Sequence, residues 1–249
     1  MSSPPRSYKT SAVVLRGRSY GEADRILTLF STERGKMDAI AKGVRRTKSP
    51  MAGRLEFANE VALTMHRGRN LDVVVSADIE KAHWQHVMQP ERFAAANVVT
   101  ELIDGFCEPD LPLPDIYELL TRALGAIGRS ADPLGLLPRF SLRLLDALGL
   151  APPLDTCIRC GASLEHKSAW LDREQAGFAG EECAVAWRDP LVLGSEEMDN
   201  VRAIGAPRGS AAAGHIATRN VAQAIETLVN DHLGRRPKAG THALLFVQR

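Results

Sequence analysis

Three cysteines are the residues of this chain whose types and spacing point most directly to chemistry. Cys157 and Cys160 form a Cys-x-x-Cys pair in "CIRCG", and Cys183 follows in "GEEC". A closed structural zinc site uses four ligands in a tetrahedron, commonly two such pairs. One cysteine of the second pair is missing here. The pattern therefore predicts either a zinc site with an unusual fourth ligand or a zinc-knuckle-like fold that has lost one.

The fourth ligand could be Glu181, Glu182, His166 or water. His166 is chemically the best of these because it would complete a Cys₃His set, although it does not lie where the second pair supplies a ligand. We favour a degenerate knuckle, with zinc a candidate cofactor that is not required. Its fold would then be kept by packing around three residues: Trp170, Phe178 and Trp187.

A thiol or metal enzyme built on Cys157 and Cys160 is an alternative, because Cys-x-x-Cys is also the spacing of dithiol redox pairs. Those pairs lie at the start of a helix that follows a strand. Here the segment "LDTCIRCGAS" follows two prolines and leads to Gly-Ala-Ser, which is a turn context. The enzyme interpretation is therefore disfavoured, and the chain has no GxxxxGK[ST] phosphate loop either.

A second group of residues with chemical potential is a run of cations in "AKGVRRTKSPMAGR", residues 41–54. Cations on a loop can contact phosphates without a fixed geometry, and each contact releases counterions. A solvated charged loop is the alternative, but the run contains no acidic residue, which favours nucleic acid. The five cations are Lys42, Arg45, Arg46, Lys48 and Arg54.

The net charge of +1 conceals an uneven distribution. Residues 1–80 carry 14 lysines and arginines against 9 carboxylates, whereas the rest of the chain is slightly acidic. Only the first third can attract a polyanion. Few aromatic residues there are candidates for base stacking, so we expect a sequence-independent, salt-sensitive contact with the phosphate backbone. Further candidate DNA-binding residues on neighbouring strands and turns are Arg16, Lys36, Arg67 and Arg69.

The elements that must position these residues change character near residue 80. Alternating apolar and polar residues predict five short strands before it, which favours a small barrel of the OB type. The expected strands are residues 11–17, 24–31, 36–43, 55–66 and 71–76.

After residue 80 the apolar period becomes helical. The expected helices are residues 91–106, 114–128, 136–149, 195–204 with Ser195 as cap, and 218–233. The predicted fold class is α+β, with an OB-fold nucleic-acid-binding domain at residues 1–80. A helical domain follows at 81–249, with the cysteine-containing insertion at about 153–190.

The stretch "SYGEADRILTLFSTERGKMDAIAKGVRRTKS", followed by "LEFANEVAL", resembles the N-terminal domain of the bacterial recombination mediator family RecO. The resemblance continues through the helical region into "CIRCG" and covers roughly residues 8–185. It implies an OB-fold, a helical domain and a cysteine-rich insertion that some members use for zinc. Gly180 stands where the family's second pair has its first cysteine.

The resemblance also implies a non-enzymatic mediator of DNA repair and homologous recombination in the RecF pathway. Such a protein binds single- and double-stranded DNA, anneals complementary strands, engages RecR and the C-terminal tail of single-stranded-DNA-binding protein, and helps to load RecA. Lys42, Arg45, Arg46 and Lys48 occupy the family's basic loop.

Arg139 and Arg143 share a helix face and are candidates for contacting the acidic tail of single-stranded-DNA-binding protein, with two solvated arginines as the alternative. An RNA-binding OB protein is a further alternative for the whole chain, since barrel shape and charge do not separate RNA from DNA. No apolar stretch approaches the roughly 20 residues that span a membrane. We therefore expect a cytoplasmic protein associated with the nucleoid.

Overall fold

The structure is a computed structural model that describes residues 6–206, 217–235 and 237–239 of the chain. It contains two compact units, residues 1–134 with 238–249, and residues 135–237. The predicted helical domain includes residues 207–216, 236 and 240–249, which lie outside the described residues. The change from strands to helices falls just after residue 81. A domain boundary at residue 80 stays a prediction.

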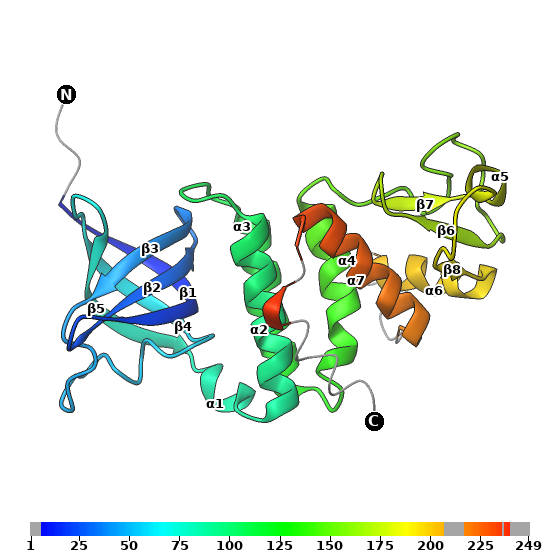
Figure 1. Cartoon of the computed structure of the whole chain (residues 1–249). Coiled ribbons are helices and arrows are strands. Elements are labelled where there is room, and N and C mark those ends of the chain that lie inside the picture. The colour runs from blue at the N-terminus through cyan, green and yellow to red at the C-terminus, as the bar shows by residue number, and fades with distance from the viewer. Residues whose placement is uncertain (1–5, 207–216, 236, 240–249) are drawn as a thin grey trace. The chain divides into compact units, whose positions relative to one another are not determined.

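Five strands form a closed barrel at the start of the chain (Figure 1). The barrel order is β1-β2-β3-β5-β4, in which β3 and β5 are parallel and the other neighbours are antiparallel. The predicted OB-type barrel is confirmed. The strands are β1 (Ser7–Tyr20), β2 (Asp24–Ser31), β3 (Gly35–Ala41), β4 (Glu60–His66) and β5 (Asp72–Lys81).

The prediction of one strand over residues 55–66 is wrong in its first five residues. The strand β4 begins only at Glu60, because Ala58 has a φ of 65° and turns the chain. The amide of Ala58 donates to the carbonyl of Val14, next to an irregularity in the β1–β2 register. Leu55 is fully buried in the barrel core, as an alternating strand would require, but a turn places it there.

Two long helices and a short one follow the barrel in the first unit. They are α1 (Trp84–Val87), α2 (Pro90–Phe106) and α3 (Pro114–Arg129). Each of the long helices has a proline in its first turn, where a missing N–H costs no intrahelical hydrogen bond. Helices α2 and α3 pack on each other through the apolar faces that the sequence predicts.

The second unit combines helices with a three-stranded sheet of order β7-β6-β8. Its helix α4 ends at Ala147, two residues before the left-handed Gly149 at which the sequence predicts its end. Its elements are α4 (Leu137–Ala147), β6 (Ala169–Asp172), β7 (Gly177–Ala179), α5 (Glu181–Ala184), β8 (Val192–Leu193), α6 (Ser195–Gly205) and α7 (Arg219–Leu233). A 3₁₀ turn, Leu134–Leu136, precedes α4.

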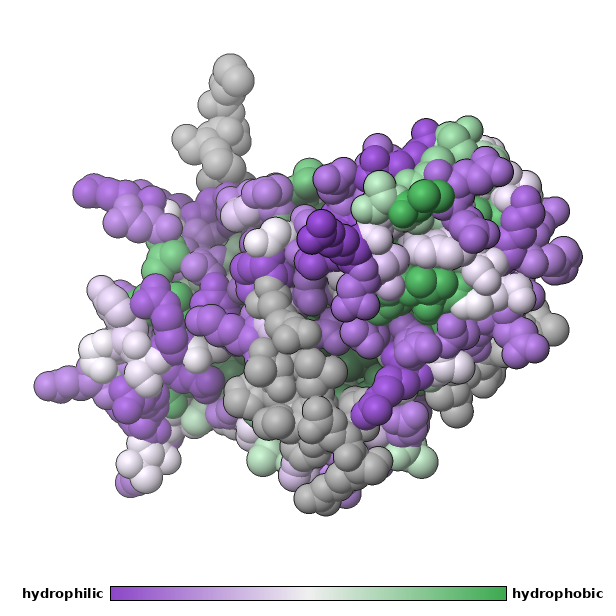
Figure 2. Space-filling model, turned by 45° about the vertical axis from the view of Figure 1, so that its right-hand side comes forward, coloured by the Kyte–Doolittle hydropathy of each residue, from purple (hydrophilic) through white to green (hydrophobic). Residues whose placement is uncertain are grey.

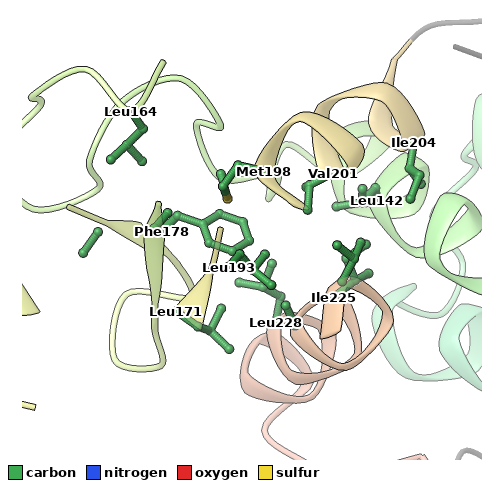
Figure 3. Close-up of a cluster of buried hydrophobic side chains, with 14 of the residues drawn as sticks. Leu142, Leu164, Leu171, Phe178, Leu193, Met198, Val201, Ile204, Ile225 and Leu228 are labelled. Carbon is green, nitrogen blue, oxygen red and sulfur yellow. The ribbon is translucent and has the colours of Figure 1, made fainter. Parts of the chain in front are cut away.

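The core of the second unit joins the small sheet to the helices. Figure 3 shows Phe178 of the sheet lying close to Met198 of α6 and Leu193 of β8. All three side chains are fully buried. The sheet therefore shares one apolar core with the helices of this unit.

The prediction that Ser195 caps α6 is wrong by one residue. Gly194 occupies the cap position, and its amide donates to the carboxylate of Glu197 at 3.0 Å. The helix α7 is capped by Thr218, whose hydroxyl accepts from the amide of Val221. Among the described residues, no helix combines the length and apolarity that membrane crossing demands.

Candidate nucleic-acid interface and cysteine cluster

The connection between β3 and β4, residues 42–59, is called the cationic loop here and is the blue loop below the barrel in Figure 1. It is a chain of hydrogen-bonded turns fixed at both ends. Val44 and Leu55 are 1% and 0% exposed and belong to the barrel core. The amide of Gly43, which has a φ of 64°, donates to Asp24 Oδ1 at 2.7 Å. Apolar anchors thus hold a hydrophilic loop on the barrel.

Four of the predicted DNA-binding residues project from the first half of this loop. All four are exposed, and in the described part of the chain none of them forms an ion pair with a carboxylate. Arg45 reaches only the carbonyl of Gly21, at 3.4 Å. Hydrophilic side chains also project from the barrel in Figure 2. We call the four the open cations: Lys42, Arg45, Arg46 and Lys48.

Three other predicted DNA-binding residues are paired with carboxylates. Arg54 donates to the carbonyl of Ala77 at 2.7 Å and to Asp78 at 2.9 Å. Arg16 pairs with the carboxylate of Asp104 at 2.9 Å. Lys36 lies 3.6 Å from the same carboxylate and donates to the backbone carbonyl of Asp104 at 2.5 Å.

The last two predicted DNA-binding residues, Arg67 and Arg69, lie in the connection between β4 and β5. Arg67 lies over the ring of Tyr8, with its guanidinium carbon 5.0 Å from the ring centroid. Arg69 is exposed. The sequence therefore predicts one group of nine cations. The structure separates them into four open cations, three that are paired with carboxylates and two between β4 and β5.

A network around Arg34 escaped sequence analysis. Arg34 donates to Asp72 at 2.6 Å and also pairs with Asp110, while the hydroxyl of Tyr8 donates to Asp72 at 2.5 Å. Burial acts to raise the pKa of Asp72, but the bonds from Tyr8, the Gly68 amide and Arg34 outweigh it and lower that pKa. The partners are 26 to 76 residues apart, so no local pattern could have indicated the network.

The three cysteines of the predicted metal site do come together. The sulfur atoms of Cys157, Cys160 and Cys183 all lie within 4.8 Å of one another. A turn closed by the Gly161 amide on the carbonyl of Cys157 places the first pair, and the start of α5 supplies the third. Cys183 lies in the first turns of that short helix, which begins after Gly180.

The thiols differ in their acidity. Burial acts to raise the pKa of Cys157, but hydrogen bonds from the amides of Gly180, Cys160 and Arg159 outweigh it and lower that pKa to about 7. The pKa of Cys183 is raised to about 11, chiefly by its contacts with the other two cysteines. Amide donors directed at a sulfur stabilise a thiolate, which is the form that binds metals.

None of the predicted protein candidates for a fourth ligand joins the three sulfurs among the described residues. Glu181, Glu182 and His166 are all exposed and lie outside the group. A Cβ atom built on Gly180 would meet only Leu164 Cδ2, at 3.6 Å, which is an ordinary contact. The chain thus offers three sulfur ligands beside a position with room for a longer side chain.

The three aromatic residues predicted to hold the cysteine-containing insertion together differ in how deeply they are buried. Phe178 is fully buried, whereas Trp170 and Trp187 are half-buried. The guanidinium carbon of Arg159 lies 5.2 Å from the ring centroid of Trp187, and Arg159 also pairs with the buried carboxylate of Asp172. Phe178 is therefore the one of the three that belongs fully to the core.

The two arginines predicted to contact a partner peptide have intramolecular partners. Arg139 donates to the carbonyls of Ile204 at 2.8 Å and Ala206 at 3.2 Å, at the C-terminal end of α6. Arg143 pairs with Asp146 at 3.2 Å within its own helix. Arg139 is therefore bound to carbonyl groups at the end of α6, and Arg143 is the more available of the two for a ligand.

Comparison with known proteins finds a matching family model for each of two parts of the chain. The family model described as "Recombination protein O N terminal" matches residues 1–83, and "Recombination protein O C terminal" matches residues 88–240. A DNA repair protein RecO from a Nocardioides species is 33% identical over 248 residues, which cover 97% of this chain and 99% of that protein.

Two further relatives with the same name match part of the chain. The protein from Cutibacterium acnes is 39% identical over 168 residues, covering 65% of this chain and 68% of that protein. The protein from Bifidobacterium adolescentis is 39% identical over 181 residues, covering 72% and 73%. With a closed barrel, a helical region and both family models matched, the chain belongs to the RecO family of DNA repair and recombination proteins.

Proposed function

We propose that this chain binds and anneals DNA as a non-enzymatic mediator of repair and homologous recombination. The observation that carries the proposal is the set of open cations on a loop anchored in the barrel core. Such a loop screens the phosphates of two strands at once and so reduces the repulsion that opposes their pairing. Contacts with phosphates alone are independent of sequence, as annealing of arbitrary strands requires.

The test replaces Arg45, Arg46 and Lys48 together by alanine. If each contacts one phosphate, the slope of log K against log salt falls by about 2 to 3 units. Over the decade of salt between 1 M and 0.1 M, that change corresponds to a loss of about 100-fold or more in affinity at 0.1 M. Fluorescence anisotropy with a labelled single strand measures both quantities.

A matched control removes three exposed cations from the other compact unit, Lys167, Arg188 and Arg219. The same change in net charge should leave the salt slope nearly unaltered. An equal loss in both triple variants would show that total charge, and not the loop, governs binding. Annealing of complementary oligonucleotides without ATP should fail in the loop variant and persist in the control.

RNA binding is the competing function, since phosphates and cations alone do not distinguish the two polymers. Membership of a DNA repair family favours DNA. Competition between RNA and DNA strands of matched sequence and length decides between them. Preference for RNA by tenfold or more would overturn the proposal.

We also propose RecR, the acidic tail of single-stranded-DNA-binding protein and, indirectly, RecA as partners in the RecF pathway. For the tail, Arg143 is the better candidate contact because Arg139 is bound to the end of α6. Arg143→Ala should weaken binding of a labelled acidic tail peptide without lowering stability, while Arg139→Ala should destabilise the helical unit. Unchanged peptide affinity in Arg143→Ala would remove that residue from the interface.

For the cysteine cluster we propose that packing, and not metal, is the main support of the insertion. The three sulfurs fit three positions of a tetrahedral zinc site, and zinc bound there would cross-link the turn at Cys157 to α5. The fourth position has no protein ligand among the described residues. We expect a zinc-to-protein ratio well below one by elemental analysis, and a ratio near one would overturn this view.

A further inference from the structure

Three aromatic rings that the proposed phosphate contacts do not use come together at the end of the cationic loop, to which Phe57 itself belongs. The centroid of Phe57 lies 5.5 Å from that of Phe93 and 6.4 Å from that of Trp84, and the last two rings are also 6.4 Å apart. The interplanar angles are 65°, 85° and 76°, so every pair is edge-to-face. Phe93 is 41% exposed and the other two rings are half-buried. The cluster therefore reaches the surface.

A buried amide connects this aromatic cluster to the cationic loop. Asn59 is 1% exposed, and its side-chain nitrogen donates to the carbonyls of Gly53 and Arg54 at 3.4 and 3.2 Å. Its side-chain oxygen accepts from the backbone amide of Trp84 at 3.0 Å. One side chain thus bonds the end of the loop to the first residue of α1.

On its other side, the helix α1 packs closely against α3 at Gly128. A Cβ atom on Gly128 would lie 2.9 Å from the Cβ of His86, and one on Gly125 would lie 3.7 Å from the ring of His83. At position 128 only glycine allows this approach, whereas the 3.7 Å at position 125 is an ordinary contact. The loop, α1 and α2 therefore present the three rings in a fixed arrangement, so a ligand would not bear the cost of assembling them.

The charge of the adjoining loop indicates which ligand suits these rings. Residues 42–59 carry five cations and one carboxylate, Glu56, which is paired with Arg25 at 3.3 Å. A ligand that combines phosphates with exposed aromatic faces is a single-stranded nucleic acid, whose bases stack on protein aromatic rings. The bases of a duplex are already stacked on each other and do not offer their faces.

We propose that Phe57, Trp84 and Phe93 form a base-stacking platform for a single strand whose phosphates lie along the cationic loop. This inference rests on the proposed DNA-binding function and adds to it a contact that a duplex does not make. It implies that single strands bind more tightly than duplexes of equal charge. It also implies that the difference comes from the rings and not from the cations.

The first experiment detects stacking on Trp84 directly. The variant Trp170→Phe/Trp187→Phe leaves Trp84 as the single tryptophan of the chain, and its fluorescence is titrated with oligo(dT) and with a duplex of equal length. We expect strong quenching by the single strand and little by the duplex. Binding seen by anisotropy without quenching would overturn the platform but leave the proposed function standing, whereas absence of binding would overturn the function itself.

A second experiment uses the otherwise native chain and does not depend on that variant's folding. Phe93→Leu keeps an apolar side chain, and Phe93→Tyr keeps the aromatic face. We expect Phe93→Leu to weaken single-strand affinity about tenfold, with duplex affinity unchanged, and Phe93→Tyr to restore it. Equal weakening for both DNAs would mean that the rings only brace the loop, and would overturn the proposal.

A peptide is the other ligand that an aromatic cluster beside cations could take. An acidic peptide ending in apolar residues is therefore tested as a competitor of oligo(dT) in the Phe93→Leu and native proteins. We expect no displacement at peptide concentrations that leave ionic strength unchanged. Displacement that depends on Phe93 would assign the cluster to a protein partner and overturn the proposal.

Discussion

The cationic loop and the cysteine cluster are the two regions that the sequence singles out, and they differ in how much geometry their chemistry needs. The loop requires only that cations be exposed together, because charges act on a polyanion over a Debye length of about 8–10 Å. The cluster requires four ligands around one point, and the structure assembles three. A phosphate-binding surface therefore makes fewer demands on the exact positions of its side chains than a metal site does.

The largest effect is expected from removing an anchor of the cationic loop. Leu55 is fully buried in the barrel core, so Leu55→Ala should lower the free energy of unfolding by about 2–5 kcal/mol. Met51→Ala, at a half-buried position of the same loop, is the matched control and should cost less. Urea denaturation measures both. Similar small losses would mean that the loop is held by its hydrogen bonds and not by its apolar anchors.

The cysteine cluster should become a full zinc site when its missing ligand is supplied. Gly180 has an ordinary φ of −76° and room for a Cβ, so Gly180→Cys can add a fourth sulfur. At free zinc 100 times above its Kd, the metal would stabilise the fold by about 2.7 kcal/mol, which a chelator would remove. Gly180→Ser has a similar shape without the thiol and should bind no more zinc than the native chain.

If Gly180→Cys and Gly180→Ser carry the same amount of zinc, position 180 does not face the three sulfurs. If the native chain already carries one zinc ion, the fourth ligand is water or a residue outside the described part. Elemental analysis beside thermal melting distinguishes these outcomes. If the fourth ligand is water, the cysteine cluster needs only three protein ligands, and the difference in required geometry between it and the cationic loop becomes smaller.

Open and paired cations should contribute unequally to DNA binding. Arg46→Ala removes an exposed cation without a carboxylate partner and should cost about tenfold in affinity at low salt. Arg16→Ala removes a cation already paired with Asp104, so its cost should be smaller. Equal losses measured by anisotropy would show that DNA displaces Asp104 from Arg16, so that pairing with a carboxylate does not keep a cation from binding DNA.

The smallest effect concerns acid stability of the barrel. The pKa of Asp72 is lower in the folded chain, so its carboxylate stabilises the fold above its ordinary pKa of about 4. This contribution disappears as the pH falls through the lowered value. Asp72→Asn should therefore be less stable than the native chain at pH 7, and the difference should shrink as the pH falls below the ordinary pKa of the carboxyl group. A difference that persists in acid would assign the effect to packing.

Much of the fold follows from local patterns in the sequence. Alternation predicts the barrel strands, the helical period predicts α2 to α4, and glycine or proline marks their ends. The pattern misplaces the start of β4 because a turn at Ala58 can bury Leu55 just as a strand would. Periodicity reports which residues are buried, and more than one backbone path satisfies it.

The sequence by itself determined where positive charge gathers and which cysteines could meet, because both depend on residue type and short spacing. Only the tertiary structure decided which cations are already paired, that Arg139 is bound to the end of α6, and that Trp84 and Phe93 meet Phe57. These contacts join residues far apart in the chain, and their partners follow from packing in three dimensions. The physical reason is that the type of a residue sets which interactions its side chain can make, whereas its neighbours in the fold decide which of these interactions are already made.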